Sequence, residues 1–309
     1  MKDDSVSELV ALVRGMRDAA PRVEASGPVL DTTGTGGDGF KTINISTLAA
    51  FVAAAAGVQV AKQNRHAISS YCGSTDFLAE LGVVYDLPPA AAADCLRQTG
   101  ICFLYSPLYH PGVVQTGVAE PPSMNVSRPG GRNADRTVSD VLVPLANPAG
   151  AQHYLLGVAD GELARKVAEV LRELGSVHSL VIHGEDGLDE ITCTKNTTVY
   201  EVKGGQVRTW TLDPTNYGYL RAPRHAILGG DAVENVLISR GVLRGRGSLY
   251  RQYVEVNSAA ALYAADRVSS LEDGIALAKE TIDSGAMARK LEQVIEVSQE
   301  LKKATAAAR

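Results

Sequence analysis

The chain has 309 residues, of which 45% are hydrophobic and 5% aromatic, enough for one large domain or for one large and one small domain. Its formal net charge is −5, so no overall positive field attracts a polyanion, and nucleic acid is not an expected partner. Any phosphate site must therefore be local.

The composition also argues against a membrane protein or a secreted protein. The longest apolar stretch, residues 48–60, is too short to span a bilayer. The N-terminus lacks the positively charged segment and apolar segment of a signal peptide. None of the four cysteines forms a C-x-x-C pair, which favours reduced thiols. We expect a cytoplasmic protein without a membrane partner.

Helices and short apolar strands alternate along the chain. Residues 5–19 carry an apolar stripe at helical spacing behind a capping residue, either Ser5 or Asp4. Further helices are expected at residues 46–56, 75–81, 90–99, 161–174, 231–244, 255–265, 271–284 and 285–301. Strands are expected at residues 28–31, 58–61, 101–105 and 179–183, with antiparallel strands within 190–212. This order predicts an α/β layer fold with a mostly parallel central sheet.

Two segments depart from the alternation. Residues 111–139 are rich in glycine and proline, which predicts a loop or a crossing between two parts of the fold. Residues 301–309 are rich in lysine and alanine and are expected to be a frayed helix end.

The strongest functional signal is the glycine-rich turn of residues 31–39. Four glycines within residues 34–39 let the backbone approach a ligand closely and adopt positive φ. The turn leads to a helix N-terminus, where N–H groups and the helix dipole favour an anion, and Asn44, Ser46 and Thr47 add polar donors. The pattern matches neither the P-loop nor the dinucleotide-binding motif. It predicts a phosphate site, with a tight turn and helix caps as the alternative.

A second anion site is expected near Lys62 and Ser74. Lys62 closes an expected strand, at the end of the sheet where ligands bind in α/β folds, and a lysine there can neutralise a phosphate. Gly73 and Ser74 form a turn that opens another helix. For Lys62 alone, the alternative is a surface lysine.

An acidic segment follows the strand expected at residues 179–183. Residues 185–190 contain four carboxylates, and the adjacent Asp189 and Glu190 suit Mg²⁺, which prefers one or two carboxylates together with substrate phosphates and water. A solvated acidic loop is the alternative. Elsewhere, Tyr109 and His110 follow the strand expected at 101–105, where His110 could contact a substrate ring or carboxylate or be purely structural.

Together these motifs resemble the anthranilate phosphoribosyltransferase family, which uses 5-phosphoribosyl 1-pyrophosphate (PRPP). The resemblance runs from about residue 8 to residue 298 and rests on residues 34–47, 73–76, 109–111, 144–151, 183–190, 229–235 and 283–285. It implies a small helical domain and a large α/β domain with the active site between them. We expect the small domain to comprise residues 1–24 and 112–140, and the large domain residues 25–111 and 141–309.

The resemblance also implies roles for individual residues. It implies that Ser46, Asp189 and Glu190 hold Mg²⁺ and that Asp38 and Lys62 join the two carboxylates in catalysis. The residues expected around PRPP are Gly34, Thr35, Gly36, Gly37, Asp38, Thr42, Asn44, Ser46, Thr47, Lys62 and Ser74. The residues expected around the acceptor are Gly34, Asn64, Arg65, Tyr109 and His110.

The sequence departs from the family on the acceptor side. The family pattern Lys-His-Gly-Asn-Arg is replaced at residues 62–66 by Lys-Gln-Asn-Arg-His, either by substitution or by a paired deletion and insertion that keeps Asn64 and Arg65 in register. The family's carboxylate-binding arginine would fall near Gly130, where Arg128 or Arg132 could replace it. The chain is also expected to be a shortened member at its N-terminus. These departures predict that anthranilate is a weaker acceptor than in other members.

Three functions remain open at this point. The first is transfer of the phosphoribosyl group from PRPP to anthranilate with release of pyrophosphate, as in tryptophan biosynthesis. The second is the same transfer to a different small aromatic acceptor in specialised metabolism. The third is that the chain is a non-catalytic or nucleic-acid-binding relative of the fold. In the first two cases the partners are small molecules, the cofactor is Mg²⁺, and a homodimer is one expectation.

Overall fold

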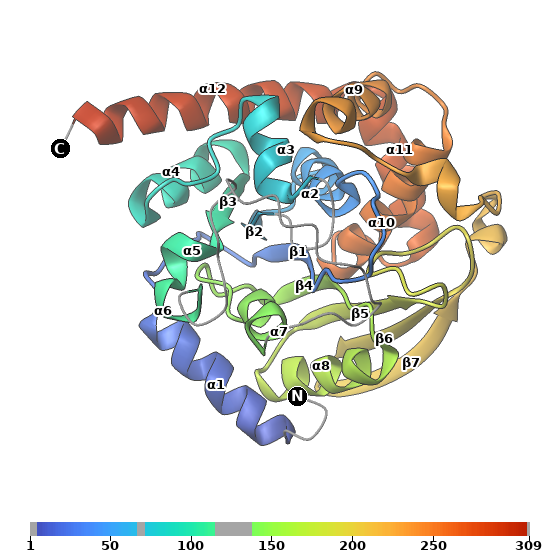
Figure 1. Cartoon of the computed structure of the whole chain (residues 1–309), viewed down its shortest axis with the longest axis horizontal. Coiled ribbons are helices and arrows are strands. Elements are labelled where there is room, and N and C mark those ends of the chain that lie inside the picture. The colour runs from blue at the N-terminus through green and yellow to red at the C-terminus, as the bar shows by residue number, and fades with distance from the viewer. Residues whose placement is uncertain (1–4, 67–71, 115–137, 308–309) are drawn as a thin grey trace.

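A seven-stranded sheet with the strand order β3-β2-β1-β4-β5-β6-β7 forms the centre of the computed structural model (Figure 1). The structure describes residues 5–66, 72–114 and 138–307. The first five strands in this order are parallel, and β6 and β7 are antiparallel. The strands are β1 Leu30–Gly34, β2 Val60–Asn64, β3 Ile101–Tyr105, β4 His153–Gly157, β5 His178–Gly184, β6 Thr197–Lys203 and β7 Gln206–Leu212.

Helices cover both faces of the sheet and bury a separate apolar cluster on each (Figure 1). The helices are α1 Val6–Ala19, α2 Ile45–Ala55, α3 Ser74–Leu81, α4 Pro89–Thr99, α5 Ser106–Tyr109, α6 Pro111–Val114, α7 Val138–Leu145, α8 Gly161–Glu173, α9 Ala232–Leu243, α10 Leu249–Ala264, α11 Leu271–Asp283 and α12 Ala286–Ala307. Helices α2, α10, α11 and α12 pack on one face, and α1, α4, α7 and α8 on the other. Within the described ranges, no helix is both long enough and apolar enough to cross a membrane.

Helix α2 is almost entirely buried between the sheet and α10. Its sequence is rich in alanine, which favours the helical conformation and whose small side chain lets neighbouring elements approach closely. Because α2 is packed between the sheet and α10, the position of its N-terminus, which follows the glycine turn, is fixed.

The strand order reverses between β1 and β4. From β1 the chain passes through α2 to β2 on one side, and later returns to β4 on the other side of β1. In open α/β sheets, ligands bind beyond the carboxyl ends of the strands at such a switch point. The glycine turn directly follows β1, so the fold positions it there.

The α/β class with a mostly parallel sheet is confirmed, and the capping of α1 by Ser5 is also confirmed. The Glu8 N–H donates to Ser5 Oγ at 3.3 Å, and the Ser5 N–H donates to Glu8 Oε2 at 2.7 Å. Helix α1 packs against α7 and α8. Its buried residues therefore belong to the same apolar cluster as α8.

Several elements differ from the sequence-based expectation. The loop expected at residues 111–139 is wrong at both described ends, where residues 111–114 form α6 and residues 138–139 begin α7. Helix α5 is not predicted either. Strand β4 is not predicted, because a buried apolar run of five residues has no periodicity that separates a strand from a helix. Helix α7 is not predicted, because it contains Pro144, which disfavours a helix interior. The expectation of a frayed end from residue 301 is wrong, since α12 continues to Ala307.

A buried polar cluster joins β5 and β6 at the amino end of β5, far along the sheet from the glycine turn. His178, whose side chain is fully buried, contacts Asp266 Oδ1 at 2.8 Å and Glu201 Oε1 at 3.1 Å. Tyr263 Oη and Trp210 Nε1 also donate to Glu201, at 2.8 Å and 3.0 Å. The hydrogen bond from His178, followed by those from Tyr263 and Trp210, lowers the pKa of Glu201 to about 2.

We predict that Glu201→Gln loses more stability at neutral pH than in acid. The pKa of Glu201 falls from its usual 4.5 to about 2 in the folded chain, so its stabilisation is complete above pH 4.5 and is lost as the pH falls towards 2. At pH 7 the loss should reach up to about 3 kcal/mol, at roughly 1.4 kcal/mol for each unit of pKa change. Urea unfolding of both proteins at pH 7, 4 and 3 measures it. The exposed Glu300→Gln is the control, and a loss for Glu201→Gln that does not vary with pH would contradict the prediction.

Candidate active site

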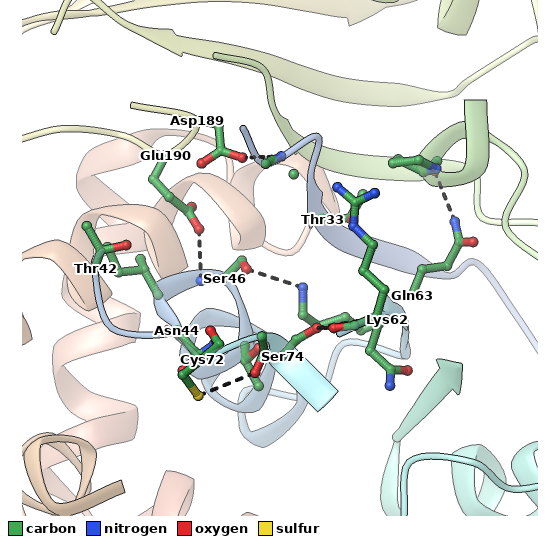
Figure 2. Close-up of a pocket in the computed structure, with 18 of the residues that line it drawn as sticks. Thr33, Thr42, Asn44, Ser46, Lys62, Gln63, Cys72, Ser74, Asp189 and Glu190 are labelled. Atoms are coloured by element: carbon green, nitrogen blue, oxygen red, sulfur yellow. Dashed lines mark hydrogen bonds between the residues drawn. The ribbon is translucent and has the colours of Figure 1, made fainter. Parts of the chain in front are cut away.

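A cavity that is open to solvent lies at the carboxyl ends of β1 and β2 beside the N-termini of α2 and α3 (Figure 2). It brings together most of the residues that the sequence predicts for the site. Those that line it are Gly34, Gly36, Asp38, Thr42, Asn44, Ser46, Thr47, Lys62, Asn64, Arg65, Ser74, Asp189 and Glu190. Segments that are distant in sequence, the glycine turn and the acidic segment, therefore share one space.

The turn after β1 needs glycine for its conformation. Gly36, Gly37 and Gly39 have φ angles of 65°, 73° and 69°, in the left-handed region that favours glycine. The N–H of Gly36 donates to Asp189 Oδ2 at 2.7 Å. The turn thus presents backbone donors to an anionic oxygen, as the sequence predicts for a phosphate site.

Two glycines make room for the acidic segment where it crosses the ends of β1 and β4. Gly34 and Gly157 are register partners in these strands. A Cβ atom at Gly34 would lie 2.6 Å from Asp189 Oδ2, and a Cβ atom at Gly157 would overlap the backbone carbonyl of Asp189. Sequence analysis does not single out Gly157, although a glycine at the end of an apolar run was a signal for close backbone approach.

The acidic segment is a closed loop that turns two of its four carboxylates into the cavity. The Gly184 N–H donates to the Leu188 carbonyl at 2.9 Å. Asp186 holds the loop internally, since its carboxylate accepts the Leu188 N–H at 3.3 Å and the Thr192 hydroxyl at 2.8 Å. Asp189 and Glu190 line the cavity, whereas Glu185 and Asp186 do not.

Buried carboxyl groups dominate one wall of the cavity. Burial, followed by the charge of Asp189, raises the pKa of both Asp38 and Glu190 well above the usual carboxyl range. Three carboxylates in one desolvated place repel one another unless a cation offsets them. The Ser46 side chain lies beside Glu190 (Figure 2) and adds a hydroxyl oxygen.

This donor set fits Mg²⁺ better than a metal held by protein alone. No group of three or more His, Cys, Asp or Glu side chains suitable for a metal occurs among the described residues. Mg²⁺ typically takes one or two carboxylates and completes its shell with substrate phosphates and water. Asp189, Glu190 and the Ser46 hydroxyl, next to a phosphate-binding turn, match that pattern.

Lys62 is the buried cation opposite this wall. Its side chain is 2% exposed, and its Nζ donates to the Thr32 carbonyl and to Ser46 Oγ, the latter at 3.3 Å (Figure 2). Burial lowers the pKa of Lys62, and the charges of Asp31, Glu190 and Asp189 oppose that change. Lys62 is therefore a buried amine directed at the phosphate site, which excludes the surface-lysine alternative.

The N-terminus of α2 faces the cavity, but Asn44 does not cap it through its side chain. Instead, Asn44 Nδ2 donates to the Cys72 carbonyl at 3.3 Å and Asn44 Oδ1 accepts from Asn235 Nδ2 at 3.1 Å. The Ser46 N–H donates to Glu190 Oε1 at 3.2 Å. Asn44 thus links the turn to neighbouring elements, and the helix N–H group is directed at a carboxylate.

Arg65 follows β2 and joins the glycine turn to α7. Its Nη1 pairs with Asp140 Oδ1 at 2.6 Å, with the two side chains 25% and 11% exposed, and its Nη2 donates to the Thr35 carbonyl. Arg128 and Arg132 lie outside the described residues. Arg65 is the one arginine among the described residues that line the cavity.

Four predicted site residues do not line the cavity: Thr35, Gly37, Tyr109 and His110. Tyr109 is 1% exposed and its hydroxyl donates to the Leu87 carbonyl at 3.0 Å, which favours a structural role. His110 is also buried, and burial lowers its pKa. Conversely, sequence analysis does not assign a ligand-binding role to several lining residues: Thr33, Phe40, Ile43, Ile45, Gln63, His66, Cys72, Ser106, Val143 and Pro144.

Comparison with known proteins agrees with this arrangement. Residues 26–288 match a family described as "Glycosyl transferase family, a/b domain". Anthranilate phosphoribosyltransferases from Brevibacillus brevis and Thermomicrobium roseum are 44% and 46% identical to this chain, and the alignments cover 95% and 98% of it and 84% and 86% of the relatives.

Solved structures of the same enzyme family also match this chain. The crystal structure of anthranilate phosphoribosyltransferase from Thermus thermophilus matches with a TM-score of 0.84 and 37% identity, over 96% of this chain and 86% of that one. The enzyme from Saccharomyces cerevisiae in complex with PRPP and Mg matches with a TM-score of 0.80 and 25% identity, over 96% and 81% of the two chains.

We predict that Gly157→Ala destabilises the protein by displacing the acidic segment. The added methyl group would overlap the Asp189 carbonyl, and overpacking of this kind typically costs about 1–3 kcal/mol. Gly241→Ala is the control, because its Cβ would meet nothing within 4 Å, and in a helix it should stabilise by roughly 0.5–1 kcal/mol. Chemical denaturation of both variants measures the difference. Equal stability of the two variants would show that Gly157 is not needed for space.

Proposed function

The chain belongs to the anthranilate phosphoribosyltransferase family, and we propose that it transfers the 5-phosphoribosyl group from PRPP to anthranilate with release of pyrophosphate. One observation carries this proposal. The glycine turn, the α2 N-terminus, Lys62 and the pair Asp189 and Glu190 all line a single cavity at the switch point of the sheet. This constellation suits a phosphorylated substrate that loses an anionic leaving group.

The chain's own groups stabilise that leaving group. Positive charge develops at C1 of the ribose as pyrophosphate departs, and negative charge gathers on the phosphate oxygens. The backbone N–H groups of the turn and Lys62 Nζ are donors that can bind those oxygens when they exchange contacts within the protein, such as those to Asp189 and Ser46, for contacts with the phosphate. When bound at Ser46, Asp189 and Glu190, Mg²⁺ supplies the positive charge that offsets both the carboxylates and the pyrophosphate.

The acceptor needs positioning more than it needs a base. An aromatic amine attacks in its neutral form, so a nearby proton acceptor is not essential, and orientation supplies much of the rate. The carboxylate of anthranilate needs a cation when it loses water. Arg65 lines the cavity, and a guanidinium can pair with two carboxylate oxygens at once. We propose Arg65 for this role, in which the acceptor carboxylate takes the place of its contacts with Asp140 and the Thr35 carbonyl; the weaker use of anthranilate stays a prediction.

The other two hypotheses receive less support. A different aromatic acceptor rests on the departures at residues 62–66, near Gly130 and at the N-terminus, and Arg65 lines the cavity as a candidate carboxylate site. A nucleic-acid-binding relative would need a basic surface, whereas one wall of this cavity carries Asp38, Asp189 and Glu190.

Three finer features of the assembly are also proposals. We propose, from the family resemblance, a small domain of residues 1–24 and 112–140 beside a large domain of residues 25–111 and 141–309; residues 1–4 and 115–137 of the small domain lie outside the described ranges. We propose a homodimer, for which Leu12, 51% exposed on α1, offers an apolar contact. We propose a cytoplasmic location, since all four cysteines are free thiols.

We predict that PRPP binds weakly without Mg²⁺ and that Glu190→Gln impairs turnover. Removing one charged partner should cost about 1.5–3 kcal/mol, or roughly 10- to 150-fold. Calorimetric titration of PRPP with and without Mg²⁺ tests the metal, and the rate of pyrophosphate release tests the variant. Glu185→Gln, in the same loop but outside the cavity, should keep full activity. Equal PRPP affinity in both buffers would remove the metal from the proposal.

We predict that Arg65→Gln raises KM for anthranilate while KM for PRPP changes little. Loss of a charged hydrogen bond to the carboxylate should cost about 1.5–3 kcal/mol. Because the substitution also strips Asp140 of its partner, the double variant Arg65→Gln with Asp140→Asn controls for the unpaired carboxylate. Both variants should lose anthranilate affinity alike. Normal anthranilate kinetics in either would exclude Arg65 as the carboxylate site.

A further inference from the structure

Gln63 lies at the boundary between the two sides of the cavity. It precedes the last residue of β2, lines the cavity and is 4% exposed. Successive side chains of a strand point to opposite faces. Lys62 and Asn64 therefore face α2 and α3, where they contact Ser46 and Thr75, whereas Gln63 faces α7.

The hydrogen-bonding network fixes which end of the Gln63 amide faces α7. Its Nε2 donates to the Val143 carbonyl at 2.8 Å, to the Pro144 carbonyl at 3.1 Å and to Asp31 Oδ2 at 3.4 Å. Rotating the amide by half a turn would put its oxygen against three other oxygens. The orientation of an amide is assigned from such networks, and here only one orientation is favourable.

Asp31 is in turn fully buried and held in place. Asn147 Nδ2 donates to Asp31 Oδ2 at 2.8 Å, and the backbone N–H of Gln63 donates to Asp31 Oδ1 at 3.3 Å. Asn147 Nδ2 also donates to the Ala61 carbonyl at 2.7 Å. Strand β1, strand β2 and the segment after α7 thus share one polar cluster that immobilises the Gln63 side chain.

The opposite end of the same amide is left without a partner. Gln63 Oε1 is buried and accepts no hydrogen bond from any described residue. An amide oxygen accepts and cannot donate, so phosphate and carboxylate oxygens cannot satisfy it. Among the groups of the two substrates, only the amino group of the acceptor and the ribose hydroxyls carry hydrogens suited to it.

We propose that Gln63 is a specificity-determining residue whose amide oxygen accepts a hydrogen bond from the amino group of the aromatic acceptor. This inference rests on the proposed function. Gln63 and Arg65 both bind α7, at Val143 and Pro144 and at Asp140. They therefore lie on one side of the cavity, so an amine and a neighbouring carboxylate on one ring can reach both.

The chemistry of the transfer fits a neutral acceptor at this position. The nitrogen lone pair forms the N–C1 bond while the C1–O bond to pyrophosphate breaks, and the nitrogen afterwards releases one proton to solvent. As positive charge develops on the nitrogen, its N–H group becomes a stronger donor. The hydrogen bond to Gln63 therefore strengthens in the transition state and raises the rate as well as the affinity.

The test compares a substrate that has the amine with a ligand that lacks it. In Gln63→Met, which keeps the length of the side chain but not the oxygen, kcat/KM for anthranilate should fall by roughly tenfold. The inhibition constant of benzoate, which has the carboxylate but no amine, should change much less. KM for PRPP should stay the same. Gln98→Met, an exposed position on α4, should leave all three constants unchanged.

Two results would overturn the inference. An equal loss for anthranilate and benzoate would show that Gln63 only supports the wall, and a rise in KM for PRPP alone would assign its oxygen to a ribose hydroxyl. If the Met variant does not fold, Gln63→Asn, which retracts the amide by one methylene, gives the same comparison. Failure of the proposed function itself is distinguishable, because the unmodified protein would then release no pyrophosphate with anthranilate.

Discussion

Two carboxylates held by backbone N–H groups at the end of the sheet are the constraint on which the site depends. Asp189 accepts from the Gly36 N–H at 2.7 Å, and Glu190 accepts from the Ser46 N–H at 3.2 Å. These contacts dock the acidic segment onto the glycine turn and α2. They are possible only because Gly34 and Gly157 have no Cβ atoms to block the crossing. The proposed phosphate site and the proposed metal site therefore share the same residues and backbone segments.

The electrostatics of this docking explain why the reaction needs a cation. Desolvation and mutual repulsion raise the pKa values of Asp38 and Glu190, and burial lowers that of Lys62. Each group is thus held in a place where its charged form is costly without a partner. In the proposed reaction, Mg²⁺ offsets the charge of the carboxylates and pyrophosphate offsets the charge of Lys62.

The acceptor side is organised by a different element. Helix α7 anchors Gln63 through two of its carbonyl groups and Arg65 through Asp140. The sequence is expected to depart from the family pattern at residues 62–66. In the structure, Gln63, Asn64 and Arg65 each have side-chain hydrogen-bond partners.

Local chemistry was readable from the sequence by itself. The glycines of residues 34–39, the lysine after β2 and the adjacent Asp189 and Glu190 indicate phosphate and Mg²⁺ because their side chains, or lack of them, suit those ligands wherever they lie. The alternation of elements also predicts the parallel sheet. Only the tertiary structure decided how these parts meet. Strand β4 has no periodicity to reveal it, Gly157 matters only through an oxygen 32 residues away in sequence, and Tyr109 turns into the core rather than the cavity. Such contacts depend on which surfaces face each other across the fold, and no short-range pattern encodes that.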